Sequence, residues 1–253
     1  MGNETLNTRM LEKLKNLWCK KKIQYFVYTH LLLLIGISTV PINIWYFYDL
    51  LIFIWFTWPI NSAIQHLYFT HNYYKFRFKF VKYVILWYIA IINFWKFSDS
   101  KSYHIIHHKE WLTDRDPTAG EVRQGYWRYY FGLTEPYALP ILYSEKDPDV
   151  ECVNKYYYPI KVVSLSIFIL LFEWHLFVHL IIIQVFLLYL TQKLIEIIFH
   201  RKDSAKDLPW LFWLYGNDAW HREHHEVSDK NIWHWKPINL QYIYSKLLFS
   251  NIE

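Results

Sequence analysis

Eight of the thirteen histidines in this chain fall into three short groups. The groups are His66-x4-His71, His104-x2-His107-His108 and His221-x2-His224-His225. On a helix, positions 0, 3 and 4 fall within an arc of about 100°, so each of the last two groups directs three imidazoles to one side. The two histidines of the first group are five apart, about 140° around a helix, and can converge only where that helix ends or distorts.

Imidazoles gathered in this number indicate a metal site. Protonated imidazoles brought together would repel one another, whereas a metal ion binds their neutral nitrogens. A catalytic zinc ion uses about three protein ligands and keeps an open position. Eight imidazoles with no thiolate are too many for one zinc ion. They suit two redox-active irons, for which imidazole is a good ligand. The histidines therefore predict a site for two Fe²⁺ ions.

The same groups resemble the histidine boxes of the membrane fatty-acid desaturases, which read HxxxH or HxxxxH, then HxxHH, then HxxHH. The resemblance covers residues 61–247. Box two is followed by a stretch similar to the family's acidic segment ending in Asp-Pro, namely Thr113-Asp114-Arg115-Asp116-Pro117. Box three begins as the family's acidic-x-Trp-His motif does, with Asp218-Ala219-Trp220-His221.

The resemblance implies a ligand set for the two irons. It makes the boxed histidines the metal ligands and, through the metals, the catalytic residues: His66, His71, His104, His107, His108, His221, His224 and His225. Family members that act on acyl-CoA have a ninth histidine at the cytoplasmic end of the fourth membrane helix, and His200 occupies that place. The candidates for holding the ligands in position are Asp114, Asp116, Asp218 and Trp220.

Glu196 is where the sequence departs from these relatives. The position four before the ninth histidine is usually Asn in them, and it reaches one iron through a water. Residues four apart share a helix face, so Glu196 faces the metals if His200 does. Two divalent ions would hold its carboxylate ionised. We hypothesise that Glu196 ligates an iron or fixes its water. The alternative is an ion pair with Lys193 or Lys202 at the helix end.

Long stretches without cations predict the elements that carry these groups. No Lys or Arg occurs between Lys22 and Lys75, which leaves room for two membrane crossings of about 20 residues each. The predicted crossings are Gln24–Val40 and Ile44–Ile60, with Pro41 in the turn between them. Basic residues flank both ends of this hairpin, which predicts that the ends lie on the cytoplasmic side.

A second hairpin is predicted at residues 157–199, with its tip at Glu173-Trp174-His175. The apolar run Val81–Lys96 is predicted to lie along the membrane as an interfacial helix, because a crossing there would put box two on the opposite side from the other boxes. Backbone groups in lipid must be satisfied within helices or a closed barrel, and the alternating strands of a barrel are absent from the sequence.

The expected fold class is an all-α integral membrane protein. It has four transmembrane helices in two hairpins, an interfacial helix, and a cytoplasmic helical cap that holds the diiron site. The chain is one domain with both termini and the active site in the cytoplasm. Its parts are a cytoplasmic tail (1–22), the first hairpin (23–63), a cap segment with the interfacial helix (64–158), the second hairpin (159–199) and a second cap segment (200–253).

The net charge of +5 points to a lipid partner rather than to nucleic acid. The basic residues stand beside the apolar spans, as expected for cations at an anionic lipid surface. We therefore expect the lipid bilayer as a partner and no nucleic acid. Cys19 and Cys152 are too few for a disulfide framework or a thiolate metal site.

The resemblance implies a fatty acyl desaturase, which introduces a double bond by removing two hydrogens from an acyl chain, with O₂ as co-substrate. The chain would be carried by coenzyme A, acyl carrier protein or a lipid, and would reach the metals through a bent apolar tunnel. The sequence has no haem-binding domain and no nicotinamide glycine motif. Electrons must then come from an external donor, a b-type cytochrome or a ferredoxin.

Two alternatives stay open. Carotenoid ketolases, carotenoid hydroxylases and alkyl hydroxylases have similar boxes. A membrane metal-binding or transport protein could also carry a histidine-rich cap, although a transporter should place polar residues at mid-membrane depth. Only His30 and Asp49 qualify there, and we expect them to hydrogen-bond to each other. The remaining histidines, His175, His179 and His234, are expected to lie outside the metal site.

Overall fold

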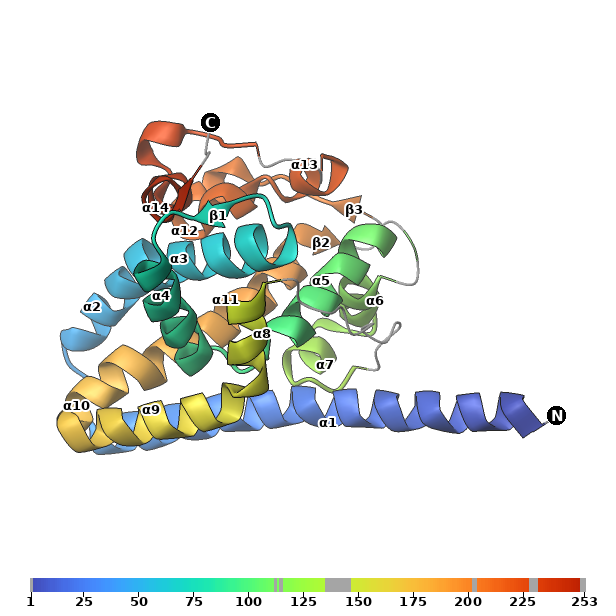
Figure 1. Ribbon diagram of the computed structural model, residues 1–253, viewed down its shortest axis with the longest axis horizontal. Coiled ribbons are helices and arrows are strands. Elements are labelled where there is room, and N and C mark those ends of the chain that lie inside the picture. The colour runs from blue at the N-terminus through green and yellow to red at the C-terminus, as the bar shows by residue number, and fades with distance from the viewer. Residues whose placement is uncertain are drawn as a thin grey trace.

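The computed structural model describes residues 2–111, 113, 116–134, 147–201, 204–227 and 232–250, and these are mostly helical (Figure 1). The described strands are only two residues long. β1 (Lys75–Phe76) pairs antiparallel with β4 (Phe249–Ser250), and β2 (His200–Arg201) with β3 (Ser204–Ala205). The helical class that the long apolar runs predict is confirmed for the described residues.

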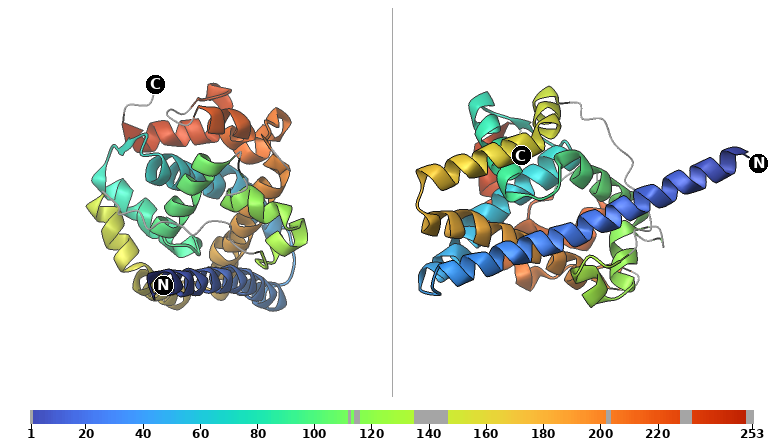
Figure 2. Two further views of the ribbon diagram at one scale, coloured as in Figure 1. Left: turned by 90° about the vertical axis from the view of Figure 1, so that its right-hand side faces the viewer. Right: turned by 90° about the horizontal axis from the view of Figure 1, so that it is seen from below.

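The first hairpin consists of two long helical arms. One arm is α1 (Gly2–Thr39), and the cytoplasmic tail predicted at 1–22 forms its first half. No proline occurs before Pro41 to interrupt the helix. Figure 2 shows the N-terminal half of α1 extending beyond the rest of the molecule. The other arm runs from Trp45 to Thr70 through α2 (Trp45–Ile52), η1 (Phe53–Thr57), α3 (Trp58–Ser62) and η2 (Ala63–Thr70).

The second hairpin is α9 (Tyr157–Leu171) followed by a helix from Trp174 to Phe199, made of α10 (Trp174–Phe177), η3 (Val178–Ile183) and α11 (Gln184–Phe199). The turns of the two hairpins lie at the same end of the molecule (Figure 1), where the Trp174 indole donates to the Thr39 hydroxyl at 2.7 Å. From this end the helix Trp45–Thr70 runs to box one, and the helix Trp174–Phe199 runs to His200.

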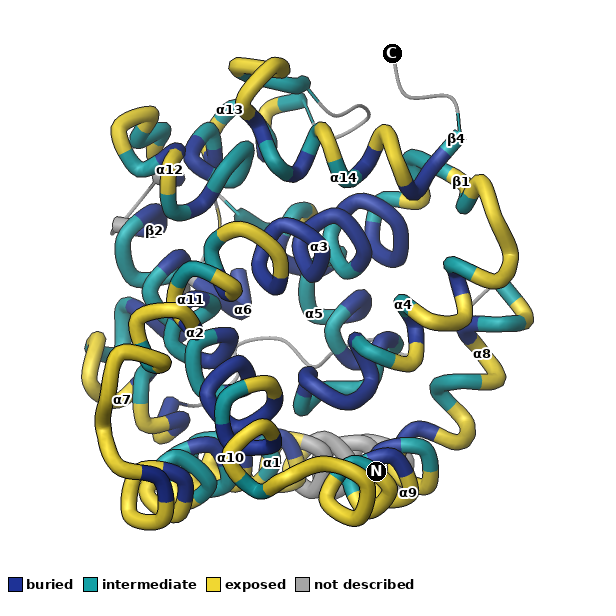
Figure 3. The backbone as a smooth tube through the Cα atoms, turned by 90° about the vertical axis from the view of Figure 1, so that its left-hand side faces the viewer, coloured by how far each residue is buried: buried dark blue, intermediate teal, exposed yellow. Residues whose placement is uncertain are grey.

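Two helices, Trp45–Thr70 and Trp174–Phe199, are long and apolar enough to span a membrane. α9 is a shorter apolar helix of 15 residues. The four-span topology and the cytoplasmic position of the termini stay predictions. Figure 3 shows the burial of the elements: α3 is entirely buried, whereas α9 exposes much of its surface.

A sharp bend between α4 and α5 directs the helix that carries box two toward box one. α4 (Lys79–Ile92), which covers most of the predicted interfacial segment, meets α5 (Phe97–Glu110) at 82°. The bend follows Asn93, whose backbone is extended. Its carbonyl accepts hydrogen bonds from the Tyr157 hydroxyl and, at 2.6 Å, from the Lys161 ammonium. These bonds satisfy the carbonyl that leaves the helix and fix the bend.

The remaining described helices are short, and together they are here called the cap. They are α6 (Pro117–Arg123), α7 (Tyr126–Tyr130), α8 (Pro148–Lys155), η4 (Pro209–Leu211), α12 (Phe212–Tyr215), η5 (Gly216–Ala219), α13 (His221–Glu226), η6 (Lys236–Ile238) and α14 (Leu240–Leu248). A hydrogen bond to the Trp55 carbonyl, which Pro59 leaves without its usual helical donor, connects α14 to the first hairpin. Proline has no N–H to donate to the Trp55 carbonyl four residues earlier, and the Tyr244 hydroxyl of α14 donates to that carbonyl at 2.9 Å.

The expected His30–Asp49 hydrogen bond is wrong. The Asp49 carboxylate lies 2.7 Å from Nδ1 of His179. Nε2 of His30 lies 2.9 Å from the Tyr130 hydroxyl instead. The reason is that η3 of the second hairpin packs against both α1 and α2, so His179 reaches Asp49 from a different hairpin.

Candidate metal centre

A local change of helix type brings the two histidines of box one together. In η2 the His71 N–H donates to the His66 carbonyl at 3.2 Å, which is the i to i+5 bond of a π-helix. One turn of a π-helix takes more residues than one turn of an α-helix, so two imidazoles five residues apart fall nearly on one face. Their ring centroids are 5.1 Å apart. This distortion is one of the two ways, a helix end or a distorted helix, in which histidines five residues apart can converge.

Nine histidines form two adjoining groups. Within each group one nitrogen per residue lies within 4.8 Å of all the others, so each group could hold a metal ion. The first group, here called site A, is His66, His71, His104, His108 and His224. The second, site B, is His107, His200, His221 and His225, all buried. The two sites touch, because the rings of His108 and His225 stack at 4.3 Å.

Each HxxHH box serves both sites. In box two, on α5, the first and last histidines, His104 and His108, belong to site A. The middle one, His107, belongs to site B. In box three, on α13, only the middle histidine, His224, belongs to site A. The outer two, His221 and His225, belong to site B. Positions i and i+4 differ by only about 40° around a helix, while i+3 lies about 60° to the other side of i. The two helices therefore bridge the sites.

The spacing of the nitrogens fits a shared ion. In site A, Nε2 of His224 lies 2.6 Å from that of His66 and 3.0 Å from that of His108. Two nitrogens bound at right angles to one ion at about 2.1 Å are about 3.0 Å apart. A neutral imidazole has one donor and one acceptor nitrogen, so several converging Nε2 atoms cannot all satisfy one another. A cation at their centre can.

Site B has the same character. Nε2 of His221 lies 2.7 Å from that of His200 and 3.2 Å from that of His225. Nε2 of His107 is buried with no hydrogen-bond partner among the described residues. His200 enters the site from the residue that follows α11, so the second hairpin contributes a ligand position directly.

Two carboxylates fix the orientation of the rings from behind. Asp116 lies 2.8 Å from Nδ1 of His107 and also accepts from the Thr118 N–H in the first turn of α6. Asp218 lies 3.3 Å from Nδ1 of His66. In both cases Nε2 is left to face the site, as in carboxylate–histidine–metal arrangements. Gln241 and Ser62 in turn donate to Asp218 at 2.8 and 3.0 Å.

The Trp220 indole makes no comparable hydrogen bond to a boxed histidine among the described residues. The Trp220 ring stacks on His234, with ring centroids 4.1 Å apart. The backbone carbonyl of Trp220 accepts a hydrogen bond from the His224 N–H at 3.1 Å. Asp114 lies outside the described residues. The supporting residues that sequence reasoning missed are Gln241 and Ser62, which carry no motif; only their contact with Asp218 identifies them.

Burial keeps most of the imidazoles in the form that binds metal. It lowers the pKa of His71 to about 3, helped by the nearby His66. Burial also lowers the pKa of His104, His221 and His224, with further lowering from neighbouring histidines. His107 is different: burial opposes its charge, but the adjacent Asp116 outweighs burial and raises its pKa. A metal ion in site B would displace that proton.

Glu196 lies at the edge of site B. Its Oε2 atom is 3.3 Å from Nε2 of His200, and it is buried with no hydrogen-bond partner among the described residues. Those residues show no ion pair between Glu196 and Lys193. Lys202, the other partner considered, lies outside them. The carboxylate therefore faces the histidines, one turn before His200.

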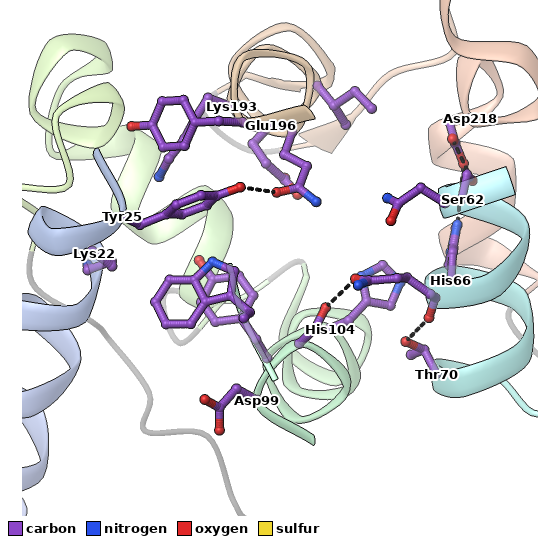
Figure 4. Close-up of a pocket in the computed structure, with 18 of the residues that line it drawn as sticks. Lys22, Tyr25, Ser62, His66, Thr70, Asp99, His104, Lys193, Glu196 and Asp218 are labelled. Carbon is purple, nitrogen blue, oxygen red and sulfur yellow. Dashed lines mark hydrogen bonds and ion pairs between the residues drawn. The ribbon is translucent and has the colours of Figure 1, made fainter. Parts of the chain in front are cut away.

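A cavity of about 210 Å³ opens beside the two sites (Figure 4). Its walls come from both hairpins, α5, α6 and α7, and His66, His104 and His221 form its metal-side wall. The lining is mixed, and the bent apolar tunnel that the resemblance implies stays a prediction. Aromatic rings alternate with polar and charged side chains, which include Lys22, Asp99, Glu121, Lys193 and Glu196.

Comparison with protein-family models finds no match, and a search of curated proteins finds none either. Any family assignment rests on the residues of this chain.

Proposed function

We propose that this chain is a membrane-bound non-haem diiron oxidoreductase, a fatty acyl desaturase that introduces a double bond into an acyl chain with O₂ as co-substrate. The observation that carries the proposal is the convergence of nine histidines, from three boxes and the end of α11, into two adjoining groups. The resemblance of those boxes to the membrane desaturases supplies the reaction.

The donor set fits iron. Site A offers five nitrogens and site B four, and neither group contains a thiolate. Zinc sites use about four ligands in all, whereas imidazole-rich sites with more ligands suit redox-active iron. When bound, two irons would supply the activation of O₂ that oxidation of an unactivated C–H bond requires.

The protein itself contributes orientation and exclusion of water. Asp116 and Asp218 hold Nδ1 of His107 and His66, so the opposite nitrogens stay directed at the sites. His107 is 1% exposed and His225 4%, which keeps water from site B. Glu196 stands between site B and the cavity, where it can ligate an ion or hold a water. The cavity would place the substrate carbon beside both sites.

Electrons would come from an external donor, a b-type cytochrome or a ferredoxin. Lys109, next to box two, and Lys206, after β3, are exposed on the cap. Cations at the surface near the sites support an acidic carrier, because complementary charge speeds the encounter of the two proteins.

The test combines metal content with product analysis. The protein purified in detergent is expected to hold about two irons, since two groups of four or more imidazoles are present. Mass spectrometry of acyl chains from cells that express it should show new double bonds. His107→Ala should abolish them, and His175→Ala, at an exposed histidine of the hairpin tip, should not. Hydroxylated or ketolated products would support the alternative reactions, and iron-free protein would contradict the proposal.

A further inference from the structure

We infer that one face of the cap, formed by η4, α12, η6 and α14, lies against the lipid of the bilayer that the long apolar helices are proposed to cross. The contact does not depend on the reaction proposed above. Six exposed apolar side chains make up this surface, here called the apolar cap face: Trp210, Trp213, Trp235, Ile238, Ile243 and Leu247.

α14 has its polar side toward the protein and its apolar side outward. Its buried side chains are Gln241, Ser245 and, at its end, Leu248. Ile243 and Leu247, one turn apart, are 36% and 62% exposed. A helix on a water-facing surface shows the opposite arrangement, with its apolar stripe on the core. The outward side of α14 therefore suits an apolar surrounding.

Hydrogen bonds hold the polar side of α14 inward. Gln241 donates to the Ser62 hydroxyl and to the Asp218 carboxylate, both at 2.8 Å. Asp218 in turn lies 3.3 Å from Nδ1 of His66 in box one. Turning α14 so that its apolar side became buried would break these bonds behind the metal centre. The apolar side must therefore stay outward.

The apolar cap face continues onto the helix Trp45–Thr70, which is long and apolar enough to span a membrane. The Tyr244 hydroxyl of α14 donates to the Trp55 carbonyl of that helix at 2.9 Å, and the rings of Tyr244 and Phe56 meet edge to face. Trp55 is 64% exposed and Phe56 45%. A helix that crosses a bilayer presents such side chains to lipid, so lipid that covers Trp55 also reaches α14.

The other part of the apolar cap face is aromatic. Trp210 and Trp213 are 72% and 70% exposed, and Trp235 is 47% exposed. The Trp235 ring lies against the buried Phe212 ring of α12, with centroids 4.6 Å apart, and η6 leads directly from Trp235 to α14. Figure 3 shows exposed positions on both α12 and α14. Tryptophan is enriched at the level of the lipid headgroups, where one end of the ring is in an apolar layer and the other is wet.

The charges of this region favour a headgroup layer. Residues 208–217 contain no charged side chain, and residues 232–250 contain no Asp or Glu but two lysines. The ammonium groups of these lysines, Lys236 and Lys246, lie 5.6 and 5.3 Å from the centre of the Tyr242 ring. Lysines at the edge of an apolar surface extend their ammonium groups toward the headgroups, and anionic lipids attract them.

The test uses fluorescence quenching in the full-length protein, reconstituted in bilayers of equal parts phosphatidylcholine and phosphatidylglycerol. Cys19→Ser and Cys152→Ser first remove the native thiols. A single cysteine is then introduced as Trp213→Cys or as Leu247→Cys and labelled with nitrobenzoxadiazole. Each label is quenched separately by aqueous iodide and by lipids that carry a nitroxide on the acyl chain.

The matched control is Glu226→Cys on α13, a cap helix whose outward side chains are charged: those of Arg222 and Glu226 are 56% and 53% exposed. We expect the ratio of lipid to iodide quenching at Trp213 and Leu247 to be at least about threefold higher than at Glu226, since an interfacial helix lies about 5–10 Å into the headgroup boundary.

A ratio equal to that at Glu226 would overturn the inference, because the apolar cap face would then be in water. Protection from both quenchers would overturn it as well, because a second copy of the chain or another protein would then cover the face. Neither outcome bears on iron content or product formation, which test the proposed function separately.

Discussion

Nε2 of His200 lies 2.7 Å from Nε2 of His221, although one residue directly follows the second apolar hairpin and the other begins the last histidine box. His200 is 2% exposed, so this contact is inside the protein. It joins the helix Trp174–Phe199 directly to the cap. Metal binding at site B would therefore also stabilise the association of hairpin and cap.

His200→Ala is expected to lose at least half of the bound iron, because site B keeps only three imidazoles. The measurement is iron per chain in detergent-purified protein. His234→Ala is the control: it removes a histidine that stacks on Trp220 and lies outside both groups. Full iron content in His200→Ala would exclude this residue from the metal centre.

The pair Asp49–His179 should couple energetically, whereas Asp49–His30 should not. Asp49 is 2% exposed, and His179 lies 2.7 Å from its carboxylate. A double-mutant cycle with alanine, followed by thermal unfolding in detergent, should give a coupling of about 1 kcal/mol or more for the first pair. The second pair should give less than about 0.5 kcal/mol. A larger coupling to His30 would contradict the hairpin packing.

The spacing of the boxes determined much of the centre, but not how the histidines are shared. Two HxxHH motifs predict three imidazoles on one side of each helix, and that holds for α5 and α13. Which imidazole joins which site depends on how the two helices face each other. The division of His107 from His108 and of His224 from His225 therefore needed the structure.

The long-range contacts were beyond the sequence for a similar reason. Asp49 has two histidines at suitable depth in neighbouring helices, and the side-by-side placement of η3 with α2 selects His179. The polar cavity gathers residues as far apart as Trp18 and Asp218. Asp218 belongs to a recognisable motif, but no local pattern marks Trp18, which looks ordinary in its own helix.

The ion pairs of Lys82 are expected to stabilise the cap with a defined pH dependence. Lys82 lies 2.7 Å from both Asp147 and Asp149, which joins α4 to the start of α8. Burial disfavours the Lys82 ammonium, but its hydrogen bonds to the two carboxylates outweigh burial and raise its pKa. Burial likewise opposes ionisation of Asp147, and hydrogen bonds from Lys82 and Tyr68 outweigh it and lower its pKa.

Lys82→Met should therefore destabilise the protein by about 2 kcal/mol at pH 7. A lowered carboxyl pKa contributes stability above the unfolded value of about 3.9 and loses it as pH falls further. The difference in melting temperature from wild type should then shrink below about pH 4. Lys79→Met, at an exposed position of the same helix, is the control. A difference that stays constant down to pH 3 would mean that packing, not charge, is lost.

Substitutions of Glu196 distinguish two roles for its carboxylate, a role at the metal of site B and a role as a counter-charge at the helix end. If its carboxylate ligates an iron or fixes its water, Glu196→Gln should lower turnover by about 10- to 100-fold, as loss of a ligand-supporting group does. Iron content should fall with it. Glu196→Asn should keep more iron and activity than Glu196→Gln, because asparagine is the residue that the resembled acyl-CoA desaturases place there. Both variants remove the negative charge, so they differ mainly in reach.

If Glu196 serves only as a counter-charge at the helix end, the two variants should behave alike, with iron content and turnover unchanged. Iron per chain and product formation, measured on the same preparations, decide between these outcomes.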